Sequence, residues 1–227
     1  MATFLQLCQR VAQESGTVSG TQPSTVVGQT GRLGSIVQWV AAAYSDIQNH
    51  RKTWLWMQGE FEASLTIAKQ RYAGSDFALT RVAEFDRGLF LYDTAKGVSD
   101  EGPLTYMQWR DFFNNCLTGA NRAISGKPVY TSFDPSGSIA LWPTPDKAYK
   151  LHGQYRDTPQ TLAADADVPE MPVRFHDIII WKALIKLSQF DEAMTQYPLW
   201  NVEYRRLLSE LEHDQLPRLT IGQERFA

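Results

Sequence analysis

The sequence contains few of the residues that build disulfide frameworks and metal centres. Its two cysteines, Cys8 and Cys116, lie far apart and form no CxxC pair. Its four histidines show neither an HExxH motif nor the i, i+4 spacing that places two imidazoles on one helix face. We therefore expect no structural disulfide, no metal ion and no cofactor, and synthesis in a reducing cytosol.

Basic charge is also scarce. Lysine and arginine number 22 against 25 aspartates and glutamates, which gives a formal net charge of −3 and an isoelectric point near 5.8. No block of lysines and arginines occurs. Because a phosphate-binding face normally shows as a basic excess, this composition argues against a protein whose main task is to hold nucleic acid.

Long apolar runs are missing as well. No stretch approaches the roughly 20 apolar residues that span a bilayer. The apolar run at residues 4–8 is short and is soon followed by Arg10 and Glu14, unlike a signal peptide. We expect a soluble protein with no export signal and no contact with a membrane.

Catalytic signatures are weak. No GxSxG motif occurs, and the glycine-rich stretch Gly28–Gly34 has Ser35 where a phosphate-binding loop needs lysine. The carboxylate pairs Glu60/Glu62 and Asp165/Asp167 could be assigned the role of a cell-wall hydrolase's two carboxylates, but solvated strand edges and acidic loops look the same. We predict that the chain is not an enzyme.

What the sequence does contain is a set of amphipathic helices at both ends. Apolar residues recur at helical spacing in residues 4–12, 33–47, 173–190 and 200–211. In the third of these segments, Ile178–Trp181 is apolar on nearly all sides, which predicts a buried helix. Cys8 falls on the apolar stripe of the first segment and is expected to pack as a small hydrophobic residue.

The middle of the chain follows a period of two. Alternation predicts strands at residues 61–67 and 149–155, and a further strand at 87–93. The tetrapeptide Asp134–Gly137 suits a type I turn and predicts a hairpin of residues 129–133 and 138–142. We expect one antiparallel sheet of about four or five strands, with a long loop at residues 69–82.

These segments predict an α+β fold. Residues 1–57 and 173–215 form a helical bundle, residues 58–172 form an inserted β-rich lobe, and residues 216–227 form an extended C-terminal tail. Pro217 ends the last helix, and the apolar residues that follow have no obvious core to join.

Four stretches resemble the head-to-tail adaptor, or head-completion, proteins of tailed bacteriophages. The stretches are VAQESGTVSGTQPSTVVGQTGRLGSIVQWVAAAYSDIQNHRKTWLWM, LWPTPDKAYKLHGQYRDTPQTLAADADVPEMP, EMPVRFHDIIIWKAL and EYRRLLSELEHDQLP. The resemblance covers most of the chain and is weakest at residues 69–105. It rests on scattered positions and not on a catalytic signature.

The resemblance implies a structural virion protein at the head-to-tail junction. Members of that family form a ring, commonly of twelve copies, that binds the portal protein, extends the DNA channel and receives the next tail component, a nozzle or tail terminator. DNA is expected to pass through without specific binding. The resemblance also implies that the C-terminal tail contacts the portal, with these candidate residues: Leu216, Arg218, Leu219, Ile221 and Phe226.

Two other functions remain open at this point. A tail-completion or baseplate subunit would have a similar composition but different partners. A virion-associated hydrolase would need one of the carboxylate pairs to line a cleft.

Overall fold

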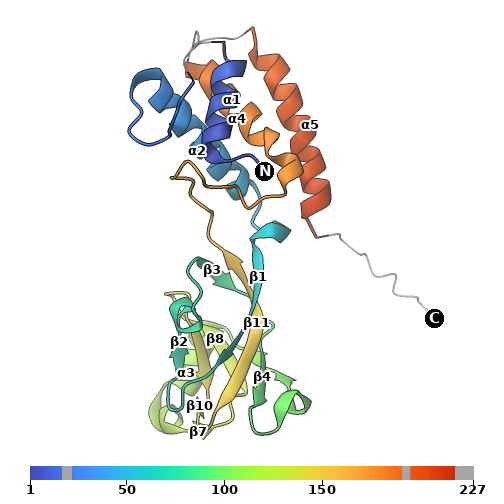
Figure 1. Ribbon diagram of the computed structural model, residues 1–227. Helices are drawn as coiled ribbons and strands as arrows, with labels where there is room; N and C mark the ends of the chain where they lie inside the picture. The colour runs from blue at the N-terminus through green and yellow to red at the C-terminus, as the bar shows by residue number, and fades with distance from the viewer. Residues whose placement is uncertain (17–21, 191–194, 218–227) are drawn as a thin grey trace, which may run out of the picture. The chain divides into compact units, whose positions relative to one another are not determined.

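The computed structural model of the chain describes residues 1–16, 22–190 and 195–217 (Figure 1). Helices at both ends of the chain flank a strand-rich middle, which confirms the predicted α+β class. The α-helices are α1 (Phe4–Glu14), α2 (Gly31–His50), α3 (Trp109–Cys116), α4 (Asp177–Phe190) and α5 (Tyr197–Gln215). The strands are β1 (Gln58–Ser64), β2 (Arg71–Tyr72), β3 (Val82–Phe85), β4 (Phe90–Asp93), β5 (Gly102–Pro103), β6 (Thr105–Tyr106), β7 (Ser125–Gly126), β8 (Tyr130–Phe133), β9 (Ile139–Trp142), β10 (Thr144–Pro145) and β11 (Tyr149–Asp157). Short 3₁₀ turns occupy Leu55–Met57, Gly74–Phe77, Gly97–Asp100, Gly119–Ala123 and Val173–Phe175.

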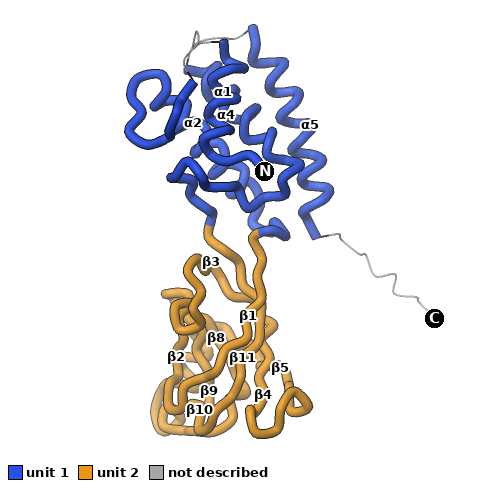
Figure 2. The backbone as a smooth tube through the Cα atoms, in the orientation of Figure 1, with its two compact units in different colours: residues 1–56, 159–227 blue, residues 57–158 orange. Residues whose placement is uncertain are grey.

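The chain divides into two compact units (Figure 2). The helical unit contains residues 1–56 and 159–227, and the β unit contains residues 57–158.

Helix α4 is the centre of the helical unit and packs against α1, α2 and α5. Ile178, Ile179 and Ile180 are all buried, as their apolar surroundings in the sequence predict. Cys8 is fully buried on α1, so it packs as a hydrophobic residue. Thr3 and Gln6 begin α1 with a reciprocal capping box, in which each side chain accepts the other residue's backbone N–H.

The predicted boundary of the inserted lobe at residue 172 is wrong, because residues 159–172 belong to the helical unit. The anchor of this segment is Gln160, whose backbone N–H donates to Gln48 Oε1 at 2.7 Å and whose carbonyl accepts from Gln48 Nε2 at 3.0 Å. The Tyr44 hydroxyl donates to Gln160 Oε1 at 2.9 Å. Gln48 is buried on α2, so these bonds satisfy polar groups that would be costly to leave unpaired.

The β unit contains two main sheets and not the single antiparallel sheet that we predicted. One sheet has the order β1-β11-β4-β5, with β3 also pairing with β11, and the other has the order β2-β9-β8-β6. The predicted hairpin is confirmed, since β8 and β9 pair antiparallel. However, β6 pairs parallel with β8, and β7 forms a separate parallel pair with β10. The predicted loop at 69–82 contains β2 and the first residue of β3.

Both sheets contribute to one hydrophobic core. Phe61, Leu91 and Leu151 come from the first sheet, and Ile139 and Leu141 come from the second. Because successive strand residues point to opposite faces, Ala140 on β9 instead contacts the buried side chains of α3. Helix α3 thereby covers the other face of the second sheet.

Candidate functional site

A pocket of about 580 Å³ lies within the β unit. Its walls come from β3 and β11 of one sheet and from β6 and β8 of the other. This volume is within the range of pockets that bind small ligands or side chains. The lining combines aromatic rings with two arginines, two acidic residues and two glutamines.

Arg87 lies beside an aromatic wall of this pocket. Its guanidinium carbon is 4.7 Å from the centre of the Tyr106 ring, and that ring is 5.7 Å from the ring of Phe133. Such a stacked guanidinium is held by the ring face while its N–H groups point outward in the plane. In the described parts of the chain, no carboxylate lies within ion-pair distance of Arg87.

Arg156 is the second cation of the pocket and is paired only loosely. Its Nη1 lies 3.5 Å from Glu84 Oε2, across the β3–β11 ladder. Its Nε is buried and has no hydrogen-bond partner among the described residues. Arg156 thus retains donor groups that the unit itself does not satisfy.

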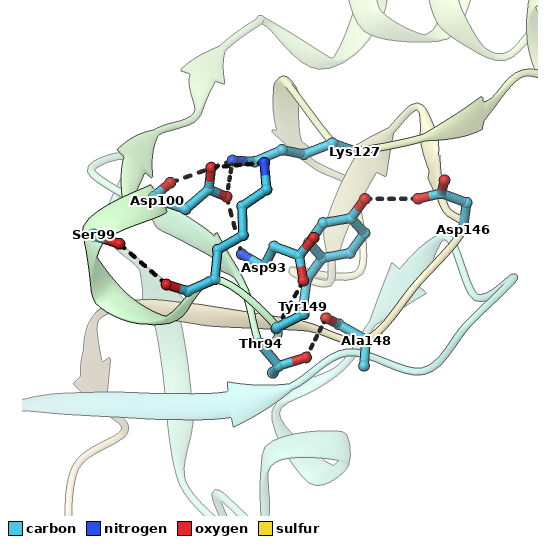
Figure 3. A network of polar contacts seen from close by, with 10 residues as sticks. Asp93, Thr94, Ser99, Asp100, Lys127, Asp146, Ala148 and Tyr149 are labelled. Atoms are coloured by element: carbon cyan, nitrogen blue, oxygen red, sulfur yellow. Dashed lines mark hydrogen bonds and ion pairs between the residues drawn. The ribbon is translucent and has the colours of Figure 1, made fainter.

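A second polar cluster in the β unit is a structural clamp (Figure 3). Lys127 Nζ donates to Asp100 Oδ2 at 2.6 Å, and the backbone N–H of Asp93 donates to the same oxygen at 3.2 Å. Lys127, followed by the Asp93 N–H, lowers the pKa of Asp100 to about 2. These bonds join the turn before β5 to β4 and to the segment before β8, so the cluster fixes loops.

The carboxylates considered for a hydrolase have structural partners. Glu62 accepts from Lys150 Nζ at 2.5 Å and from the Tyr92 hydroxyl at 3.0 Å, and Lys150 first and Tyr92 second lower the pKa of Glu62. Glu60 accepts from Gln154 Nε2 at 3.0 Å. The two side chains of this pair therefore bind different partners.

The pair Asp165/Asp167 supports the loops around α1 and α2. Asp165 Oδ1 accepts from the backbone N–H of Val26 at 2.6 Å and from the Thr25 hydroxyl at 3.1 Å. Asp167 Oδ2 accepts from two consecutive backbone N–H groups, those of Ala163 and Ala164, each at 2.7 Å. In residues 1–16, 22–190 and 195–217, no cluster of three potential metal ligands occurs.

The cysteines lack the features of nucleophiles. Burial raises the pKa of the Cys8 thiol to about 12 and also raises the pKa of Cys116. Catalytic thiols need the opposite shift.

Of the predicted tail contacts, Leu216 belongs to the described residues. Leu216 is half-buried, and its backbone N–H donates to the Glu212 carbonyl at 3.1 Å, which closes α5. The other candidates, Arg218, Leu219, Ile221 and Phe226, lie outside the described residues. Among the helices of the described ranges, none combines the length and apolar character of a membrane span.

Comparison with known proteins identifies the family. The family model described as "SU10 adaptor protein" matches residues 2–224, which is nearly the whole chain. The comparison with curated proteins found no match. The resemblance to phage adaptors noted in four stretches thus extends to both units, and the chain belongs to the SU10 adaptor protein family of phage structural adaptors.

Proposed function

We propose that this chain is the subunit of a ring that connects the portal to the tail and extends the channel through which DNA passes. The observation that carries this proposal is the family match over residues 2–224, because it includes both the helical unit and the β unit. The ring would contain about twelve copies, bind the portal on one side and receive the next tail component, a nozzle or tail terminator, on the other. It would lie at the head-to-tail junction of the virion.

The charge of the chain supports this role. A channel that DNA must slide through should not hold phosphates tightly, and the formal net charge of −3 provides no basic excess to do so. In such a ring, each subunit would contact its two neighbours through two different faces, and the ring closes when the rotation between subunits completes a full turn.

We also propose a structural and not a catalytic role. The two carboxylate pairs of the hydrolase alternative are bound to loop N–H groups, a lysine, a tyrosine and a glutamine. Neither pair is left to act as acid and base across a cleft.

Single-particle imaging of the full chain mixed with its portal tests the proposed ring. We expect a closed ring of this chain seated on the portal, with DNA-sized space at its centre. The portal alone and the chain alone are the controls, and a monomer in the second control is compatible with the proposal because such subunits can assemble on their partner. A portal that carries no bound chain would contradict the adaptor role and favour a tail-completion or baseplate subunit.

A further inference from the structure

The pocket of the β unit has no part in the proposed tail-to-portal contact. Its residues come from strands that are far apart in sequence, yet they form one lining that combines aromatic rings with two arginines. We propose that this pocket binds a glutamate or aspartate, together with an adjacent aromatic or aliphatic side chain, from an extended segment of a partner protein. The proposal does not depend on ring formation.

The carboxylate preference follows from the two arginines. A guanidinium presents a planar fork of donors that matches a carboxylate. The distance of 3.5 Å between Arg156 Nη1 and Glu84 Oε2 is longer than the roughly 2.7–2.9 Å of a strong charge-assisted bond. The Nε of Arg156 lacks an acceptor in the described parts of the chain but is buried, so only the Nη groups of this arginine are open to a ligand. A visiting carboxylate would accept from the exposed guanidinium of Arg87 and, in competition with Glu84, from the Nη groups of Arg156.

The apolar preference follows from the rings. Tyr106 and Phe133 pack side by side, and Phe133 stacks on the buried Phe85 with ring centres 6.5 Å apart. These rings are held in place by the common core, so they form a preformed apolar surface and little ordering entropy is lost on binding. An aromatic or aliphatic side chain next to the carboxylate would cover them.

A peptide fits this lining better than nucleic acid does. Glu84 and Asp86 also line the pocket and are exposed, so an extended anion would come close to both carboxylates. A phosphate backbone would bring several negative charges toward these carboxylates, whereas a peptide brings one carboxylate to the arginines. Of the two glutamines of the lining, Gln154 already donates to Glu60, and Gln58 can bind peptide N–H and C=O groups.

The test is NMR titration of the full-length chain, with arginine side chains labelled with ¹⁵N. The probes are two capped tetrapeptides that differ in one residue, Ser-Glu-Phe-Ser and Ser-Gln-Phe-Ser, and the dinucleotide of thymidine. We expect the glutamate peptide to shift the guanidinium signals of Arg87 saturably and the glutamine peptide to bind at least about tenfold more weakly, because only the charged group makes charge-assisted bonds.

Three variants connect these shifts to the pocket. Arg87→Gln and Arg156→Gln should each weaken binding of the glutamate peptide, whereas Arg122→Gln, at an exposed arginine elsewhere in the β unit, should not. Arg87 is exposed, so its replacement keeps the test valid if Arg156→Gln disturbs folding. Equal binding of both peptides, or unchanged binding in Arg87→Gln, would overturn the proposal. A response to the dinucleotide in place of the peptides would identify a nucleic-acid site instead.

Discussion

At the scale of single residues, Gly153 shows how tightly the β unit is packed. This glycine on β11 faces Phe61 across the ladder, and a Cβ atom built on it would lie 2.3 Å from Leu89 Cδ2 and 3.2 Å from the Phe61 ring. Leu89 and Phe61 are both buried in the common core, so neither can move away cheaply. Only glycine at this position leaves room for the Leu89 side chain and the Phe61 ring to pack against β11.

Replacement of Gly153 with alanine should therefore destabilise the β unit by about 1–3 kcal/mol, the usual cost of overpacking. Amide hydrogen exchange of β1 and β11 measures this loss. Gly102→Ala is the matched control, because a Cβ at Gly102 meets nothing within 4 Å. Equal protection of β11 in both variants would contradict the account of Gly153.

His176 makes the stability of the helical unit depend on pH. Its imidazole is buried, its Nε2 lies 3.1 Å from the Met171 carbonyl, and its Nδ1 has no partner among the described residues. Burial lowers the pKa of His176 below its ordinary value of 6.5, although the Met171 carbonyl raises it in part. The folded state therefore binds fewer protons than the unfolded state once the pH falls below about 6.5.

Because of this difference, the free energy of unfolding should decrease as the pH falls from 7 to 5. Hydrogen exchange of α4 at several pH values measures the effect. The variant His176→Gln should lose most of this pH dependence, while His152→Gln, at a half-exposed histidine of the β unit, should keep it. A His176→Gln protein with the pH dependence of the natural chain would rule out this explanation.

At the scale of elements, α4 is the helix on which the helical unit depends. It contacts α1, α2 and α5, and Ile179 is fully buried in it. Ile179→Asp should unfold the helical unit, at a cost of several kcal/mol, since a lone buried carboxylate has no partner to offset its lost hydration. Circular dichroism measures the loss of helix.

Val202→Asp provides the matched control for this substitution. Val202 lies on α5 with 62% of its surface exposed, so the same change of side chain should leave the fold intact. A native-like Ile179→Asp protein would show that α4 is not the centre of the unit.

The helices, several strands and the β8–β9 hairpin were predictable from the sequence, but the pairing of distant strands into two sheets was not. Residues such as Leu7 and Ile36 recur at helical spacing within one segment, so the signal is local. Strand β3, by contrast, has only four residues, and its partner β11 begins more than 60 residues later in the chain. Pairing at that distance depends on the tertiary fold, which local alternation does not encode.

The same reason explains which parts of the candidate site were missed. Neither Arg87 nor Arg156 is part of a motif that the sequence reveals. The two arginines line one pocket only because β3, β6, β8 and β11 come together. The carboxylate pairs were visible in the sequence, but their hydrogen-bond partners Lys150 and Val26 were not. We infer a structural role for the carboxylates from these hydrogen-bond partners.

At the scale of the whole molecule, the C-terminal segment is the proposed contact with the portal. The last fully buried side chain of α5 is Leu211, and the helix is closed at Leu216 before the segment begins. Removal of Arg218–Ala227 should therefore leave both units folded and impair binding to the portal. Co-sedimentation with purified portal measures the binding.

A matched control for this truncation keeps the length of the segment. Replacement of Leu219, Ile221 and Phe226 with serine should weaken portal binding nearly as much as the truncation, if the apolar side chains make the contact. Full binding by the truncated chain would show that the portal is held by another surface.

The pairing of β1 with β11 has a practical consequence. Gln58, close to the point where the chain passes into the β unit, pairs directly with Arg156, close to the point where it returns, so these two residues are about 5 Å apart. A linker of a few glycines in place of residues 57–158 would span that gap without redirecting either flanking segment. The inserted unit can in this sense be removed or exchanged as a whole, while both segments of the helical unit keep their own residues.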